Sequence, residues 1–271
     1  MITHEHRQIY QSDIKDKEWE VLERHLPPPS IRGRPLEYSL REILNAILYI
    51  LRTGSAWRMM PHDLPPWQTV YCHFNKWSKD GTWEGINTML REELRQAEGR
   101  EATPSAGIID SQSVETTRTK GERGYDAGKK VKGRKRHLLV DTSGLVLLAV
   151  VTNADVQDRD GAKLVFLRIR DRFPRLKLIW ADGGYRGKLI AWTKAVLDCI
   201  LEIVKRNDDV NGFQVLPRRW VVERTFGWLG NYRRLSKEYE ILPETSEAMI
   251  YAAMIHIMTR RLARSTAIRA P

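Results

Sequence analysis

Cysteine is scarce in this chain of 271 residues: only Cys72 and Cys199 are present, in unrelated surroundings. Two isolated thiols exclude a disulfide-rich scaffold and a zinc site built from cysteines, and they are typical of the reducing cytoplasm. The fold must therefore depend on a hydrophobic core, and 42% of the residues are hydrophobic. We expect a cytoplasmic protein of one large domain or two modest ones.

Long apolar runs are also absent. The most apolar stretches, such as residues 43–51, are far shorter than the roughly 20 residues that span a membrane. The first six residues, MITHEH, lack the apolar centre of a signal peptide. We therefore expect no membrane partner, and the chain shows neither internal repeats nor low-complexity tracts.

Acidic residues are outnumbered by basic ones, with 34 Asp and Glu against 45 Lys and Arg, which gives a net charge of +11. Such a balance favours a polyanionic partner, nucleic acid above all. A soluble protein that is merely basic is the alternative on charge alone. The net charge therefore predicts a nucleic-acid partner.

The first hundred residues have helical periodicity. Apolar side chains recur at helical spacing in four segments, 13–26, 39–51, 67–79 and 83–97. The second and third segments are joined by a proline-rich loop, as in a helix-turn-helix-like module. A polar linker, residues 99–105, follows. These patterns predict an all-α DNA-binding domain over 1–100 and a second domain over 101–271.

The second part of the chain mixes strand and helix patterns. Strands are predicted at 107–114, 137–142, 145–153, 176–181 and 200–205, and helices at 160–173, 189–197, 218–232 and 244–264. Three early strands followed by strands that alternate with helices indicate an α/β fold with a mixed five-stranded sheet flanked by helices. Residues 120–135 read as a basic, glycine-containing loop that is flexible without DNA.

Three acids stand out in this second part. Asp110 and Asp182 each end or follow a short apolar run, and Glu223 lies in an arginine-rich helix. Taken singly, the two aspartates could be turn residues, and Glu223 could pair with Arg219 one helical turn earlier. Together, three carboxylates that would repel one another are typical of a site for Mg²⁺ or Mn²⁺. Two such ions would activate the attacking oxygen and stabilise the leaving oxygen in phosphodiester transfer.

Four motifs resemble the DDE transposases of the insertion-sequence family five kind. They are IDSQSV at 109–114, GRKRHLLVDT at 133–142, ADGGYRG at 181–187 and RWVVERTF at 219–226. GRP at 33–35 and SAWR at 55–58 extend the likeness to the helical front end. The resemblance implies a ribonuclease-H-like domain, two divalent ions per site, and Asp110, Asp182 and Glu223 as catalytic metal ligands.

The same resemblance matches Arg219 to an arginine one turn before the glutamate. Related elements often carry a tyrosine three positions before that arginine and a lysine seven after the glutamate. Here those positions hold Leu216 and Gly230. Arg233 and Arg234 are the candidate substitutes for gripping the transferred-strand phosphate.

Further DNA contacts are predicted from basic and polar side chains. Arg32 and Arg34 flank a glycine in a segment similar to a minor-groove hook, although an ordinary basic turn fits as well. The exposed side of the third helix and the basic loop supply the remaining candidates: Gln68, Thr69, His73, Asn75, Lys76, Lys129, Lys130, Lys132, Arg134, Lys135 and Arg136.

Other candidate residues rank lower. His137 and His256 are interpreted as structural, and Trp220 and Trp228 as core residues. The acids Asp155, Asp158 and Asp160 form a second cluster in a loop outside the ordered triad.

The leading hypothesis is a transposase that binds the terminal inverted repeats of an insertion sequence, cleaves DNA there and transfers the strands to target DNA. Binding two double-stranded ends at once predicts a homodimer or a larger assembly. A plain metal-dependent nuclease and a transposase-derived DNA-binding regulator are the alternatives.

Overall fold

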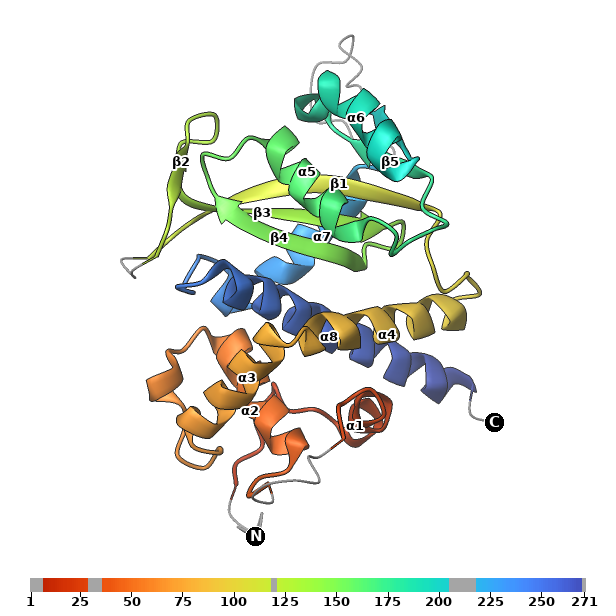
Figure 1. Ribbon diagram of the computed structural model, residues 1–271. Helices are drawn as coiled ribbons and strands as arrows, with labels where there is room; N and C mark the ends of the chain where they lie inside the picture. The colour runs from red at the N-terminus through yellow and green to blue at the C-terminus, as the bar shows by residue number, and fades with distance from the viewer. Residues whose placement is uncertain (1–6, 29–35, 118–120, 205–217, 270–271) are drawn as a thin grey trace, which may run out of the picture. The chain divides into compact units, whose positions relative to one another are not determined.

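The computed structural model describes residues 7–28, 36–117, 121–204 and 218–269, with side chains up to residue 265 (Figure 1). Contacts divide the chain into two units. The helical unit contains residues 1–100, 231–236 and 248–271, and the sheet unit contains 101–230 and 237–247. None of the helices in the described ranges is long and apolar enough to cross a membrane.

This division differs from the predicted domains at the C-terminal end of the chain. We expected all of 101–271 in one domain, but 231–236 and 248–271 group with the first hundred residues. The physical reason is the last helix, whose residues 248–256 are all buried. In addition, the Tyr232 hydroxyl donates to the carbonyl of Ala253 (3.2 Å), and Arg234 donates to the carbonyl of Ser55 (3.1 Å).

The helical unit contains the four helices that the periodicity predicts. They are α1 (Asp16–Glu23), α2 (Leu40–Thr53), α3 (Trp67–Lys79) and α4 (Thr82–Ala97). The same unit also contains two short 3-10 helices, η2 (Trp57–Met59) and η4 (Arg233–Leu235), and the part of α8 (Pro243–Arg269) from residue 248 on. Ser39 caps α2 by accepting a hydrogen bond from the Glu42 amide, and Gly54 ends it in the left-handed conformation.

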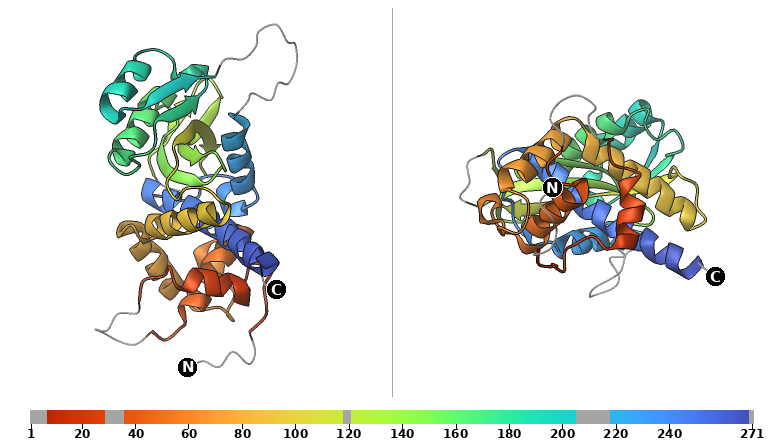
Figure 2. Two further views of the ribbon diagram at one scale, coloured as in Figure 1. Left: turned by 90° about the vertical axis from the view of Figure 1, so that its right-hand side faces the viewer. Right: turned by 90° about the horizontal axis from the view of Figure 1, so that it is seen from below.

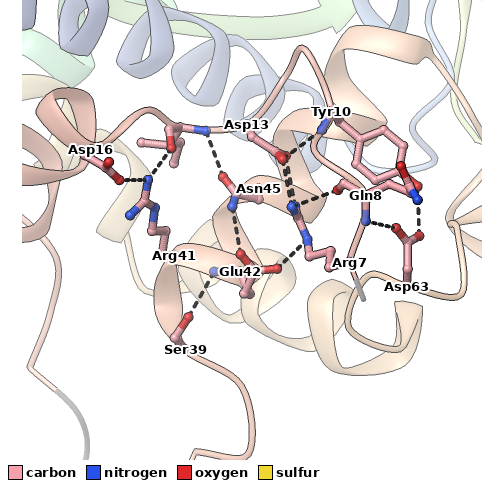
Figure 3. Close-up of polar contacts among 11 residues, drawn as sticks. Arg7, Gln8, Tyr10, Asp13, Asp16, Ser39, Arg41, Glu42, Asn45 and Asp63 are labelled. Atoms are coloured by element: carbon pink, nitrogen blue, oxygen red, sulfur yellow. Dashed lines mark hydrogen bonds and ion pairs between the residues drawn. The ribbon is translucent and has the colours of Figure 1, made fainter. Parts of the chain in front are cut away.

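A polar network attaches the N-terminal segment to α2 (Figure 3). The Arg7 guanidinium forms ion pairs with Asp13 (2.7 Å) and Glu42 (2.6 Å). The side-chain oxygen of Asn45 accepts a hydrogen bond from the Ile14 amide (2.9 Å). These buried polar contacts fix how residues 7–16 approach the first long helix.

The sheet unit has the predicted mixed α/β architecture. Its elements are β1 (Ala106–Glu115), β2 (Gly124–Asp126), β3 (Val131–Asp141), β4 (Val146–Asn153), α5 (Asp158–Ile169), β5 (Leu178–Ala181), η3 (Gly183–Tyr185), α6 (Lys188–Leu197), β6 (Ile200–Ile203) and α7 (Trp220–Gly230). The strand order is β2-β3-β1-β5-β6, and β4 pairs with β3. The β1, β5 and β6 strands are parallel, and the other pairings are antiparallel.

Helices cover both faces of this sheet. The α5 helix packs against β4, β3 and β1, and α7 packs against β1 and β3 from the opposite face (Figures 1 and 2). The core under α5 includes Ile109, Leu139, Leu148, Val165 and Phe166, all fully buried. Because β1 is packed on both sides, Asp110, in the middle of this strand, has a fixed place in the sheet.

The predicted basic loop over residues 120–135 is wrong for half of its length. Residues 124–126 and 131–135 belong to a β-hairpin, β2 and β3, and the two strands pair from Gly124–Gly133 to Asp126–Val131. The glycines of this segment predict a flexible loop. Gly133 instead allows close strand approach, since a Cβ there would lie only 1.9 Å from the carbonyl oxygen of Val114.

Candidate active site

Asp110 and Asp182 lie at the same level on neighbouring parallel strands. Ile108 of β1 pairs with Trp180 of β5, so the acid two positions after each lies at the same edge of the sheet. Asp182 directly follows β5, and its Oδ1 accepts a hydrogen bond from the Gly184 amide (2.8 Å). The turn after β5 therefore fixes one carboxylate beside the other.

The electrostatics at Asp110 favour a positive partner. Burial raises the pKa of this carboxyl to about 6, and the neighbouring negative charge of Asp182 acts in the same direction. The Ser111 amide, which donates to Asp110 Oδ1 (2.7 Å), and the cations Arg219 and Lys129 act in the opposite direction. An ionised Asp110 would be stabilised by any cation bound between it and Asp182.

The α7 helix carries Glu223, which is linked to Asp182 through the guanidinium of Arg219. One guanidinium nitrogen of Arg219 lies 2.8 Å from Glu223 Oε1, and another lies 3.9 Å from Asp182 Oδ2. Arg219 thus bridges the second and third predicted acids. Over the described ranges, no three His, Cys, Asp or Glu side chains are grouped so that they could hold a metal ion.

The position of α7 is fixed by the turn between β3 and β4. The Thr225 hydroxyl donates to the carbonyl of Gly144 (2.7 Å), and the Arg224 guanidinium donates to the carbonyl of Ser143 (2.9 Å). Gly144 also allows α7 to lie close, because a Cβ there would be 2.8 Å from Thr225 Oγ1. Both contacts come from the two residues that follow Glu223, so they fix the turn of α7 that carries it.

Asp158, at the start of α5, lies beside this site although we ranked it low. Its Oδ1 accepts a hydrogen bond from Ser111 Oγ (2.7 Å) and lies 3.0 Å from Lys135 Nζ. Burial raises the pKa of Tyr185 well above its usual value, and the nearby charges of Asp110, Asp158 and Asp182 act in the same direction, while the Ser111 side chain acts against them. The sequence signal was the acidic cluster Asp155, Asp158 and Asp160, which begins two residues after β4 ends.

Three residues of the predicted DNA-binding set are buried in the sheet unit instead. Arg134, Lys135 and Arg136 are at most 5% exposed. Arg134 donates to the carbonyls of Glu122 and Glu240, both at 3.0 Å, and Arg136 donates to the carbonyl of Lys237 (3.2 Å).

Lys135 is tied to Asp126 as well as to Asp158. All three side chains are buried among polar groups of the sheet unit, so the structure lends no support to their predicted contact with DNA.

The other lysines of that segment are on the surface. Lys129, Lys130 and Lys132 are exposed, and Lys129 Nζ donates to the carbonyl of Ser111 (3.1 Å), one residue from Asp110. A positively charged edge therefore begins at the acidic site. The predicted role of these three lysines in DNA binding is retained as a proposal.

The candidates on the helical unit have mixed positions. Gln68 and Lys76 are exposed on α3, and Thr69, His73 and Asn75 are half-buried there. Arg32 and Arg34 lie outside the described residues.

The substitutes proposed for the missing lysine, Arg233 and Arg234, are in the helical unit. Arg233 is exposed. Arg234 is buried and donates a hydrogen bond to the carbonyl of Ser55, so the assignment of Arg234 as a phosphate ligand is withdrawn. Gly230 ends α7, and Leu216 lies outside the described residues.

The lower-ranked aromatic residues divide into two groups. His137 and His256 are packed inside, and burial lowers the pKa of each to about 4, which fits the structural roles expected of them. Trp220, by contrast, is 41% exposed, and Trp228 is half-buried. The Arg224 guanidinium lies over both indoles, at 4.5 and 4.6 Å, so neither tryptophan is the core residue we expected.

Comparison with known proteins identifies the family. The family model described as "Transposase DDE domain" matches residues 101–258, and the one described as "Putative transposase of IS4/5 family" matches residues 14–87.

Two proteins of Burkholderia cepacia are similar to parts of the chain. The "Insertion element IS402 uncharacterized 16.2 kDa protein" is 33% identical over 108 residues, 37% of this chain and 71% of the relative. The "Putative transposase for insertion sequence element IS402" is 32% identical over 121 residues, 40% of this chain and 54% of the relative. No solved structure matches the chain.

The first family model spans more than half of the chain and includes Asp110, Asp182 and Glu223, and its domain has the ribonuclease-H-like fold expected from the motifs. The chain therefore belongs to the DDE transposase family.

Proposed function

We propose that this protein binds the terminal inverted repeats of an insertion sequence, cleaves the DNA there and joins the freed ends to target DNA. The observation that carries the proposal is the pair Asp110 and Asp182, side by side on parallel strands, with Arg219 joining Asp182 to Glu223. Cleavage and joining are both displacements at phosphorus, so one carboxylate site can serve both steps.

The donor type suits a divalent cation, although among the described residues Asp110, Asp182 and Glu223 are not yet grouped around one position and Arg219 lies between the last two. Carboxylate oxygens are preferred by Mg²⁺ and Mn²⁺, and burial raises the pKa of Asp110, a shift that a bound cation would oppose. The Arg219 guanidinium already brings positive charge between Asp182 and Glu223. We assign Asp110, Asp182 and Glu223 as the residues that would hold two ions, which when bound would activate the attacking oxygen and stabilise the leaving one.

Arg219 has a second role in this proposal. A guanidinium that pairs with carboxylates can also bind a phosphate through two parallel hydrogen bonds. Once Glu223 has another positive partner, Arg219 is free to turn toward the phosphate backbone. This would place a phosphate ligand one helical turn before Glu223, in a chain that has Gly230 where related elements often carry a lysine.

The test uses the purified full chain with labelled element-end DNA, target DNA and Mg²⁺, and the products are sized. Joined products support transposition. Nicks without joining would support a plain nuclease, and binding without cleavage would support a regulator; either result overturns the proposal. Two ends must be held at once, so we further propose that a homodimer or a larger assembly forms on DNA in the nucleoid.

DNA binding by the basic edge gives a separate prediction. Changing Lys130 and Lys132 to glutamine is expected to weaken affinity for end DNA, because both side chains are exposed and carry positive charge beside the site. The slope of log affinity against log salt should become shallower by about 0.9 for each phosphate that the variant no longer neutralises. Fluorescence anisotropy across a salt series measures both quantities.

The matched control changes two lysines that are ion-paired elsewhere in the sheet unit. Lys163 pairs with Asp160, and Lys177 pairs with Asp198. Their double glutamine variant removes the same charge and should keep the wild-type slope. Equal slopes for the two double variants would show that the basic edge binds no phosphate.

A further inference from the structure

Ser111 connects several charged groups around Asp110. Its amide donates to Asp110 Oδ1 (2.7 Å), its carbonyl accepts from Lys129 Nζ (3.1 Å), and its hydroxyl donates to Asp158 Oδ1 (2.7 Å). Asp158 therefore holds the residue that orients the Asp110 carboxylate. Lys135 Nζ, buried and 3.0 Å from the same oxygen, compensates the charge of Asp158.

The second oxygen of Asp158 has no such partner. No hydrogen bond or ion pair within the described ranges uses Asp158 Oδ2. This oxygen faces Gly184, where a Cβ would lie 3.7 Å from it and 3.0 Å from Asp182 Oδ1. The space that glycine leaves at position 184 is thus bordered by two carboxylates.

Tyr185 supplies an independent sign that a polar ligand belongs there. Its side chain is fully buried, and its hydroxyl makes no hydrogen bond of ordinary geometry within the described part of the chain, although the Ser111 side chain lies near enough to lower its pKa. The hydroxyl lies within electrostatic reach of Asp110, Asp158 and Asp182. A buried hydroxyl without a partner costs free energy, and such groups are normally satisfied by ordered water or a ligand.

We propose that Asp158 Oδ2 and the Tyr185 hydroxyl bind the water molecules around a divalent cation held by Asp110 and Asp182. The inference rests on the proposed function, and it makes Asp158 and Tyr185 positioning residues outside the direct ligand set. Groups that hydrogen-bond to the ligands or waters of a metal site commonly alter metal affinity by about 10- to 100-fold.

Two conservative variants separate this role from a structural one. Tyr185→Phe removes only the hydroxyl, so folding stability should be unchanged or higher because a buried unpaired group is lost. Asp158→Asn keeps an Oδ1 acceptor for Ser111 and replaces Oδ2 by an amide that cannot accept a hydrogen bond. Both variants should bind Mn²⁺ about tenfold more weakly, as followed by the paramagnetic resonance of free Mn²⁺.

Matched controls are Tyr125→Phe, on exposed β2, and Asp160→Asn, in the first turn of α5 with its side chain exposed. These should bind Mn²⁺ like the wild type, and Asp110→Asn should lose binding. Wild-type affinity in both Tyr185→Phe and Asp158→Asn overturns this inference alone. A wild-type protein that binds no Mn²⁺ overturns the proposed function and this inference together.

Discussion

Changing Asp182 to asparagine is expected to abolish DNA nicking and joining while DNA binding and folding persist. A carboxylate that helps to hold a catalytic cation supports several kcal/mol of transition-state stabilisation, so a loss of about 10³-fold or more is expected. The fold should survive because asparagine Oδ1 can still accept the Gly184 amide that organises the turn after β5. The charge removed also lies beside that of Asp110, so repulsion decreases.

The measurement is the single-turnover rate of nicking on end DNA, with DNA affinity and urea unfolding as companions. Asp198→Asn is the control, because Asp198 is an exposed acid of the same unit that pairs with the surface lysines Lys177 and Lys194. It should nick at the wild-type rate. Retained nicking by Asp182→Asn would refute the assignment of Asp182 as a metal ligand.

Changing Gly161 to alanine is expected to destabilise the sheet unit strongly. A Cβ at this position of α5 would lie 2.0 Å from Cε1 of the His137 ring, which is fully buried in β3. Overpacking of this kind typically costs about 1–3 kcal/mol. Alanine is the better helix former by about 1 kcal/mol, so helix propensity alone predicts the opposite sign.

Urea unfolding of Gly161→Ala and Gly227→Ala distinguishes the two effects. Gly227 lies in α7, and a Cβ there would meet nothing within 4 Å. Gly227→Ala should therefore raise the free energy of unfolding by up to about 1 kcal/mol, while Gly161→Ala should lower it by about 2 kcal/mol or more. A Gly161→Ala protein as stable as the wild type would mean that α5 does not pack this closely on β3.

The sequence made the positions of Asp110 and Asp182 predictable, because each is tied to a short apolar run that reads locally as a buried strand. The same local reading failed for Arg134, Lys135 and Arg136. Their charge suggested DNA, but strand pairing on both sides of β3 buries them against carbonyls and acids that are remote in the sequence.

Asp158 was undervalued for a related reason. Its importance depends on Ser111 and Tyr185, which are 47 and 27 positions away and reach it only through the packing of α5 on the sheet. The sequence pattern also did not predict that α8, from residue 248 on, groups with the helical unit. An apolar helix shows in its sequence that it must be buried, but not by which part of the chain.

The hydrogen bonds from Arg224 and Thr225 to the β3–β4 turn have a consequence for how such proteins diverge. They orient Glu223 from within α7 itself, so the glutamate does not depend on the chain that joins β6 to α7. The number of residues in that connection is therefore free to change in evolution. A relative could gain an entire extra domain at this point and still present its glutamate to the same two aspartates.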